Sequence, residues 1–249
     1  MIDGMVSVIT PMYNAEKWIE KTIQSVQAQS YSCWEMIIMD DCSTDGSPEI
    51  VKSLQKQDSR IRYYRNGANS GVAMTRNQAI SYAKGQYIAF LDSDDKWYPS
   101  KLERQIVKMQ KEQIAFCYSA CEVIDESGKR VNIRNVPEKA GYKELLKGNA
   151  IPCLTVVLDR KQIPEISMPR MPHEDYAAWL KITGSGITAY GMNEVLAGYR
   201  EAGSSVSSDK FQAMRWTWAI YRQFLGLSFA KACYCFCFYV INALKKRTS

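Results

Sequence analysis

The sequence has a single histidine, His173, and lacks the cysteine spacings that hold a structural zinc ion. It has eight cysteines, but no C-x-x-C pair occurs, and a chain of 249 residues is much longer than the secreted domains that depend on disulfides. The G-x-G-x-x-G and G-x-x-x-x-G-K-[ST] motifs are also absent, which removes the main support for a Rossmann dinucleotide site or a P-loop. The first ten residues include Asp3 and no basic residue, so we expect no secretory signal and a cytoplasmic location with reduced thiols.

The C-terminal segment lacks acidic residues and lacks a long apolar run. After Asp209 there are seven basic residues and no acidic one, which leaves the rest of the chain with one net negative charge against +6 for the whole. A nucleic-acid binder normally has a basic patch on its folded body, so we expect no nucleic-acid partner. The uncharged run 232–244 has 13 residues, whereas a membrane-spanning helix needs about 20.

The C-terminal segment is instead rich in aromatic residues, and its last basic residues are Lys245, Lys246 and Arg247. Aromatic and basic residues together favour helices that lie on an anionic membrane surface through residues 211–247, so the protein is expected at the inner face of the cytoplasmic membrane. The alternative is a helix that docks on the core or on a second subunit. The oligomeric state stays open.

Strand-like and helix-like segments alternate through the first hundred residues. We expect strands at Val6–Thr10, Met36–Met39, Ile61–Tyr64 and Tyr87–Leu91, with helices at Ala15–Gln29, from Ser47, and at Val72–Ala83. Further along we expect a helix at Lys101–Lys111, a strand pair around residues 126–128, a strand at Thr155–Leu158, a helix at Glu174–Ile182, and strands at Ile187–Tyr190 and Val195–Tyr199. This order predicts an α/β fold with a mostly parallel sheet, whose site lies beyond the carboxyl ends of the strands.

Acidic residues follow two of these strands and begin one helix. They are Asp40 and Asp41 after Met36–Met39, then Asp92, Asp94 and Asp95 after Tyr87–Leu91, and Glu174 and Asp175 at the start of Glu174–Ile182. A lone acid in a turn or at a helix start has an ordinary structural role. Three acids within four residues repel one another, and a divalent cation with oxygen ligands relieves that repulsion. The sequence therefore predicts a Mg²⁺ or Mn²⁺ site near Asp92 and Asp94.

A turn and a helix start lie between the acidic groups, at residues 69–77. The turn consists of Asn69, Ser70 and Gly71, and Arg76 follows one helical turn later. The backbone N–H groups of a helix start suit a phosphate, and a guanidinium adds a fork of donors. An ordinary capped helix with a solvated arginine is the alternative.

Six segments resemble, in the same order, the motifs of inverting family 2 glycosyltransferases of the GT-A fold. They are VSVITPMYNAEKWIEKTIQSVQAQSY, WEMIIMDDCSTDGSPEIV, GVAMTRNQAI, YIAFLDSDDKW, HEDYAAWLKI and YREAGSSVSS, and the resemblance covers residues 5–210. It implies a mixed, mostly parallel sheet flanked by helices over residues 1–208, followed by a C-terminal tail of amphipathic helices over 209–249.

The resemblance also implies roles for individual residues. The nucleotide-sugar site would comprise Pro11, Tyr13, Asn14, Glu16, Asp41, Asn69, Gly71, Arg76, Asp92, Ser93 and Arg200. Asp41 matches the carboxylate that binds uracil, which favours UDP. Asp94 would bind the metal, Asp92 the ribose or the metal, and Asp175 would be the general base.

One motif departs from the family. Its members often have a histidine where this chain has Ala202, so a contact to the metal or diphosphate has lost its usual residue. Arg200 or the segment Ser204–Ser208, which includes Ser205 and Ser207, could replace it. We expect His173 to pack or to cap the helix.

The expected reaction is a single displacement in which an acceptor hydroxyl attacks the anomeric carbon of a nucleotide sugar. The resemblance further implies a saccharide acceptor on a polyprenyl diphosphate, in bacterial surface polysaccharide synthesis. A sugar nucleotidyltransferase is an alternative, although it would normally have a glycine-rich basic loop where Pro11 to Asn14 stand. A non-catalytic sugar-nucleotide-binding module is a third, although the acids for base and metal are present.

Overall fold

The computed structural model describes residues 1–201 and 210–245. Predictions that concern Ala202, Ser204–Ser208, Lys246 and Arg247 therefore lie outside the described residues.

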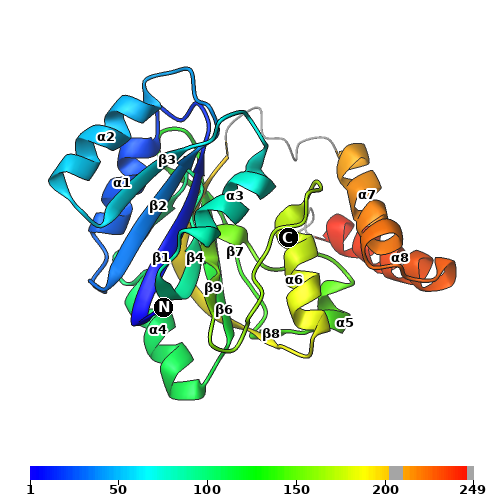
Figure 1. Ribbon diagram of the computed structural model, residues 1–249. Helices are drawn as coiled ribbons and strands as arrows, with labels where there is room; N and C mark the ends of the chain where they lie inside the picture. Colours follow the sequence, from blue (N-terminus) through cyan, green and yellow to red (C-terminus); the bar gives the residue numbers. More distant parts are fainter. Residues whose placement is uncertain (202–209, 246–249) are drawn as a thin grey trace.

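The first half of the chain forms repeated strand–helix units, as predicted (Figure 1). Its elements are β1 Ile2–Met12, α1 Ile19–Gln27, β2 Trp34–Asp40, α2 Ser47–Gln57, β3 Ile61–Arg65, α3 Val72–Ser81 and β4 Gly85–Phe90. Strand β1 pairs in parallel with β2 and β4, and β2 pairs in parallel with β3. The carboxyl ends of β1, β2 and β4 consequently meet at one edge of the sheet.

The second half continues the same sheet. Its elements are β5 Lys96–Trp97, α4 Lys101–Glu112, β6 Phe116–Ile124, β7 Arg130–Arg134, β8 Lys139–Ala140, α5 Tyr142–Leu145, the 3₁₀ turn η1 Cys153–Thr155, β9 Val157–Asp159, α6 Glu174–Gly184 and β10 Ala189–Arg200. The strand order is β3-β2-β1-β4-β9-β6-β10-β5, and β6 runs parallel to β10. The short β9 is antiparallel to both β4 and β6 and joins the two halves.

The predicted mixed, mostly parallel sheet is confirmed, because its longest pairings are parallel and its short ones antiparallel. Two local predictions are wrong. The strands expected at Ile187–Tyr190 and Val195–Tyr199 are one strand, β10, with register shifts between Met192 and Ala197 that interrupt its periodicity. The first helix begins at Ile19 rather than Ala15, because the preceding residues form a loop bonded to residues 43–47.

Both faces of the sheet are covered, and successive side chains of each strand pack on opposite sides. In β2, Met36 and Ile38 belong to the core cluster that includes residues of α1, α2 and α4, whereas Ile37 and Met39 belong to the cluster that includes residues of α3, α5 and α6. This alternation explains why the inner strands are apolar almost throughout. It also fixes the strand ends firmly enough to position the residues that follow them.

The C-terminal segment forms α7 Lys210–Ala219, a π-helical turn η3 Ile220–Phe224, and α8 Phe229–Lys245. Its inner face docks on α5 and α6 (Figure 1): the Tyr221 hydroxyl, 3.2 Å from the Tyr176 hydroxyl, donates to the carbonyl of Leu146 at 2.7 Å. Ala232 and Cys235 join the same core cluster. The alternative in which the tail packs on the core is thus confirmed for this face.

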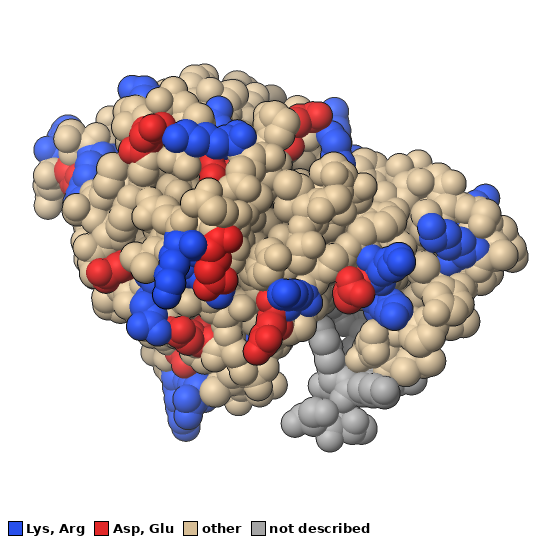
Figure 2. All heavy atoms as spheres, turned by 90° about the horizontal axis from the view of Figure 1, so that it is seen from below, with Lys and Arg blue, Asp and Glu red and all other residues tan. Residues whose placement is uncertain are grey.

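The described residues of the tail leave a second face uncovered. Tyr234 and Ile241 on α8 are exposed, as are Phe211 and Phe229. On the underside of the molecule, basic and acidic side chains mix over the α/β body (Figure 2). Within residues 1–201 and 210–245, no helix is both long and apolar enough to cross a membrane.

Candidate functional site

The acidic residues predicted from the sequence come together at the carboxyl edge of the sheet. Asp41 directly follows β2, and Asp92, Asp94 and Asp95 follow β4. Asp175 lies in the first turn of α6. Helix α3 begins beside these strand ends and places Arg76 between Asp92 and Glu174.

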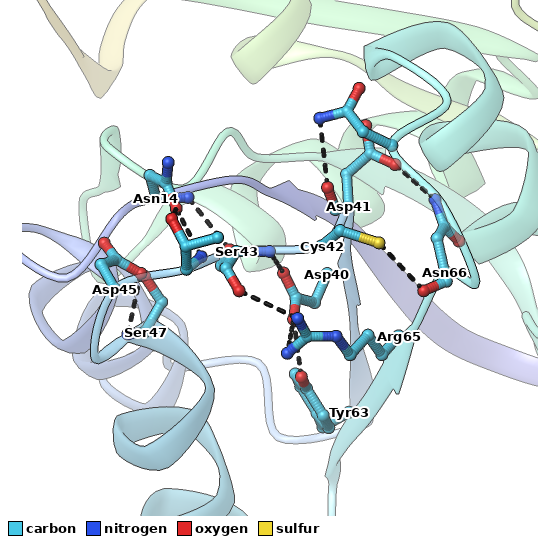
Figure 3. A network of polar contacts seen from close by, with 12 residues as sticks. Asn14, Asp40, Asp41, Cys42, Ser43, Asp45, Ser47, Tyr63, Arg65 and Asn66 are labelled. Atoms are coloured by element: carbon cyan, nitrogen blue, oxygen red, sulfur yellow. Dashed lines mark hydrogen bonds and ion pairs between the residues drawn. The ribbon is translucent and has the colours of Figure 1, made fainter.

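Asp41 is a buried carboxylate that organises the turn before α3 (Figure 3). Its Oδ1 accepts bonds from Asn66 Nδ2 at 2.7 Å and from the Ser70 backbone N–H at 2.8 Å, and its Oδ2 accepts from the Gly71 N–H at 2.9 Å. Burial alone would raise the pKa of Asp41, but the donors of Ser70, Asn66 and Gly71 outweigh burial and hold the pKa below its ordinary value. Asp41 is therefore an oriented anion, and Oδ2 keeps a second lone pair for another donor.

The turn itself needs Gly71, which has a φ of +82° at the start of α3. No atom lies near the position a Cβ would take there, so the backbone conformation rather than space favours glycine. Asn69 donates from Nδ2 to the carbonyl oxygen of Asp41 at 3.2 Å. Asn69 and Gly71 thus hold the turn against Asp41, next to the edge where the resemblance puts the ribose.

The loop after β1 is bonded to the loop after β2 (Figure 3). Asn14 Oδ1 accepts from the Thr44 N–H at 2.8 Å, and Glu16 Oε2 accepts from the Gly46 N–H at 3.0 Å. Pro11 is buried in β1 beside Met39, and Tyr13 is exposed. The side chains of Asn14 and Glu16 therefore tie the loop after β1 to the loop after β2 through backbone N–H groups, and the side chain of Tyr13 is exposed beside them.

The three acids after β4 have different surroundings. The side chain of Asp92 is 34% exposed, whereas Asp95 is buried and accepts a bond from the Arg200 backbone N–H at 2.7 Å. Burial, together with the charge of Asp92, raises the pKa of Asp94 to about 6. Burial and the charges of Asp94 and Asp92 likewise raise the pKa of Asp95. These acids repel one another, and a cation would relieve the repulsion.

The donor set here fits a divalent cation only in part. Among the described residues, no three histidine, cysteine or acidic side chains are arranged to hold a metal ion. Asp92 and Asp94 are hard oxygen donors, and Mg²⁺ in proteins often uses one or two carboxylates and takes its remaining ligands from substrate phosphates and water. The site therefore suits a cation that arrives with a diphosphate. Ser93 lies between these two acids, and its carbonyl accepts from the Thr22 hydroxyl at 3.0 Å.

Asp175 lies on α6, in the second half of the chain, and is close enough to Arg76 and Asp92 for their charges to act on it. Its Oδ2 accepts from Asn149 Nδ2 at 3.4 Å. Burial raises the pKa of Asp175, and the nearby positive charge of Arg76 opposes that rise. Cys153, which begins η1, shares this environment, since the charges of Arg76, Asp92, Asp175 and Glu174 all act on its thiol. A half-buried carboxylate with a raised pKa can accept a proton, and the role of Asp175 as a general base stays a prediction.

Arg200 is the last residue of β10 and bonds to the loop that contains Asp94. Its Nε donates to the carbonyl of Asp94 at 2.8 Å, its Nη1 donates to the carbonyl of Asp125 at 2.9 Å, and the guanidinium lies 4.0 Å from the ring centre of Trp18. These contacts position the backbone of the loop. A role of Arg200 at the diphosphate, in place of the family histidine, stays a prediction.

His173 packs and also occupies the cap position of α6, close to what we expected. It is the N-cap residue in a left-handed backbone conformation, with a φ of 56° and no side-chain cap bond, and its ring contacts the edge of Trp216 with ring centres 5.2 Å apart. Burial lowers the pKa of His173. The C-terminal segment therefore contacts the residue two positions before Asp175.

Sequence reasoning missed three members of the site. Glu174 was visible as an acid at a helix start but carried no assigned role. Asn149 and Cys153 had no signal at all, because they lie in an irregular stretch without periodicity or a motif. Only the fold brings them beside Asp175.

Comparison with known proteins gives matches at the level of family, sequence and fold. The model of the family described as "Glycosyl transferase family 2" matches residues 7–162. The chain is 46% identical over 245 residues to the putative teichuronic acid biosynthesis glycosyltransferase TuaG of Bacillus subtilis, and the match covers 98% of this chain and 97% of the relative.

A second relative carries a more detailed name. The chain is 41% identical over 249 residues to the UDP-Glc:alpha-D-GlcNAc-diphosphoundecaprenol beta-1,3-glucosyltransferase WfgD of Escherichia coli, which covers 98% of this chain and 96% of the relative. Among solved structures, S. aureus TarS 1–349 in complex with UDP-GlcNAc is similar in fold, with a TM-score of 0.73 at 19% identity, covering 95% of this chain and 71% of that chain.

We expect Asp41→Asn to destabilise the protein by about 1–3 kcal/mol, because an amide cannot accept all the bonds that Ser70, Gly71 and Asn66 donate to the carboxylate. Urea unfolding of the purified variant measures this loss. Asp125→Asn is the control, since Asp125 also accepts backbone N–H bonds, but in an exposed turn, and it should lose less. Equal losses in the two variants would contradict the buried anchoring role of Asp41.

Proposed function

Because the chain belongs to glycosyl transferase family 2, has the GT-A fold and is an inverting glycosyltransferase of bacterial polysaccharide synthesis, we propose that it transfers a sugar from a UDP-sugar to a lipid-linked saccharide. The observation that carries this proposal is the meeting of Asp41, the acids after β4 and Asp175 at one edge of the sheet. Family membership favours glycosyl transfer over the nucleotidyl transfer and the non-catalytic binding that the sequence left open.

The donor is proposed to lie across the carboxyl ends of β1, β2 and β4. Asp41 is held ionised and offers an Oδ2 lone pair, which suits the N3–H of a uracil ring. The exposed ring of Tyr13 is placed to cover the base, with Pro11, Asn14 and Glu16 as the wall behind it. Asn69 and Gly71 lie next to the ribose, and Asp92, Ser93 and Asp94 next to the diphosphate.

A bound Mg²⁺ or Mn²⁺ on Asp94 and Asp92 would supply positive charge against the departing diphosphate. The remaining chemistry belongs to the protein. Asp175 accepts the proton of the acceptor hydroxyl as that oxygen attacks the anomeric carbon, and the bond from carbon to the diphosphate oxygen breaks on the opposite side. A single displacement of this kind inverts the anomeric centre, and it needs no enzyme nucleophile.

The acceptor is proposed to be a GlcNAc unit on a polyprenyl diphosphate, and the donor UDP-glucose. The name of WfgD supports both, since that relative matches this chain over nearly its whole length. Such an acceptor is held in a membrane by its lipid. A protein that uses it must therefore work at the membrane surface.

The C-terminal segment is proposed as the part that meets that surface, as a tail of residues 209–249 attached to the catalytic body of residues 1–208. Tyr234 and Ile241 lie seven residues apart on one face of α8, and Lys231 is exposed near them. Apolar side chains flanked by basic ones favour an anionic membrane surface, where each cation contributes about 1 kcal/mol. This arrangement would put the protein at the inner face of the cytoplasmic membrane.

The transfer itself is tested with UDP-glucose and a GlcNAc-diphosphoryl lipid in the presence of Mn²⁺. We expect a glucosylated product, and we expect Asp175→Asn to lower kcat by about 10²–10⁴-fold, the usual contribution of a general base. The control is Asp159→Asn, a buried carboxylate paired opposite Tyr87, near the amino end of β4. Asp159→Asn should leave kcat within about threefold.

The pH profile gives a second reading on Asp175. The base must be ionised, so kcat/KM should fall as the pH falls through the pKa of Asp175, which burial holds above that of an ordinary aspartate. Activity should be retained on the alkaline side. Full activity of Asp175→Asn would contradict the assignment of the base. So would residual activity of Asp175→Asn whose kcat/KM still falls at low pH as in the wild type.

We expect the protein to co-sediment with phosphatidylglycerol vesicles and to lose at least about fivefold in affinity when Tyr234 and Ile241 are both changed to serine, because their apolar area then no longer enters the interface. Val107→Ser is a matched control, since Val107 is an exposed apolar residue on α4. Vesicle binding that is unchanged in the double variant, or equal with phosphatidylcholine vesicles, would contradict the membrane assignment.

A further inference from the structure

Arg76 is a buried cation that reaches two acidic motifs at once. Its side chain is only 4% exposed, and it extends from α3 between the end of β4 and the start of α6. Nη2 donates to Asp92 Oδ1, and Nη1 donates to Glu174 Oε1. One guanidinium therefore joins a residue of the proposed donor site to the helix that carries Asp175.

The burial of Arg76 makes this cation depend on its acidic partners. A guanidinium out of water is destabilising unless carboxylates surround it, and here two of them do, at side-chain exposures of 34% for Asp92 and 12% for Glu174. The remaining nitrogen, Nε, has no hydrogen-bond partner among the described residues. Each terminal nitrogen of Arg76 thus uses one of its two N–H groups for an acid, so neither nitrogen is fully free for a phosphate.

This geometry differs from the role that the family resemblance implies. There Arg76 closes over the ribose and the diphosphate, whereas here its two terminal nitrogens are bonded to Asp92 and Glu174. Glu174 likewise faces Arg76, while its neighbour Asp175 is bonded to Asn149. The two acids at the start of α6 therefore have separate tasks.

We propose that Arg76 is a positioning residue, and that Glu174 is its counter-charge rather than a second base. The ion-paired junction Asp92–Arg76–Glu174 fixes the donor side of the site relative to the start of α6, and so places Asp175 on the correct side of the anomeric carbon. This inference rests on the proposed function.

Geometry makes such a junction important for turnover. In a single displacement the base, the attacking oxygen and the leaving group must be nearly in line, and a misplacement of about 1 Å can cost about 10²-fold in rate. Asp92 follows β4, in the first half of the sheet, whereas Asp175 lies on α6, in the second half of the chain. Within residues 1–201 and 210–245, the short β9 is the strand that joins β4 to β6. A lysine at position 76 keeps the charge but replaces the planar fork with a single ammonium, so it cannot bridge both carboxylates in the same way.

The test uses Arg76→Lys, Glu174→Gln and the double variant of the full chain. We expect each single variant to lower kcat at least tenfold. The kcat of the double variant should lie no more than about threefold below that of the less active single variant, because each change breaks the same junction. The dissociation constant of UDP, measured in EDTA so that no cation bridges it to Asp92, should stay within about threefold. Arg62→Lys is the matched control, since Arg62 pairs with Glu35 in another part of the sheet, and its kcat should stay within about twofold.

Three results would overturn the inference. One is a loss of UDP affinity that parallels the loss of kcat, which would make Arg76 a phosphate ligand. Another is an Arg76→Lys variant within about threefold of the wild-type kcat, and the third is single-variant losses that multiply in the double variant.

A readout independent of turnover separates this inference from the proposed function. Amide hydrogen exchange should accelerate in both segments 91–95 and 173–177 of Arg76→Lys, and should not change there in Arg62→Lys. If the wild-type protein transfers no sugar, the proposed function fails, while accelerated exchange still supports the junction. Unchanged exchange in Arg76→Lys overturns the junction whatever the activity.

Discussion

A buried guanidinium between two carboxylates joins the two halves of this protein. Arg76 comes from α3, which packs on the parallel strands β1 and β2, and its partners follow β4 and begin α6. Without the charge of Arg76, Asp92 and Glu174 would lose their positive partner inside the protein, close to Asp94, Asp95 and Asp175. The arrangement tolerates this much negative charge in one place because it includes a fixed cation and, as proposed, a metal ion that arrives with the donor.

At the same edge of the sheet, two adjacent aspartates have different roles. Asp40 is fully buried, accepts from the Tyr63 hydroxyl at 2.7 Å and pairs with Arg65, so it holds β2 against β3. Asp41, the next residue, points instead to the turn before α3 and is the proposed ligand of the base. Adjacent residues at the end of a strand point in opposite directions, which explains why one of the pair is structural and the other lies at the site.

Much of the fold and of the candidate site could be predicted from the sequence, since the signals for them are local. Strands β2 and β4 are apolar runs ended by acids, and a serine and proline mark the start of α2. What could not be predicted depends on contacts between distant residues. Arg76 and Glu174 are separated by 98 positions, so no spacing rule connects them, and an ordinary capped helix with a solvated arginine was the alternative interpretation of the same residues, which the burial of Arg76 contradicts. The bulges of β10 interrupt its alternation, and a single strand therefore looked like two.

For the C-terminal segment, the sequence predicted the helices and left docking on the core and contact with a membrane as alternatives. Its aromatic residues are divided between two faces, because Tyr221 lies buried against Tyr176 while Tyr234 is exposed. Composition alone cannot make that division, since it depends on which side of each helix meets α5 and α6. The contact of Trp216 with His173 further shows that the segment reaches the start of the helix that carries Asp175.

The central claim is that the acids at the carboxyl edge form a site for a nucleoside diphosphate and a divalent cation. Thermal unfolding with UDP, with and without Mn²⁺, in the wild-type protein and in Asp94→Ala, tests it most directly. A ligand at about 100 times its dissociation constant stabilises a protein by about 2.7 kcal/mol, which is a measurable shift in Tm. The account predicts a shift with UDP that Mn²⁺ enlarges in the wild type and does not enlarge in Asp94→Ala. No shift with UDP, or a full enlargement by Mn²⁺ in Asp94→Ala, would contradict it.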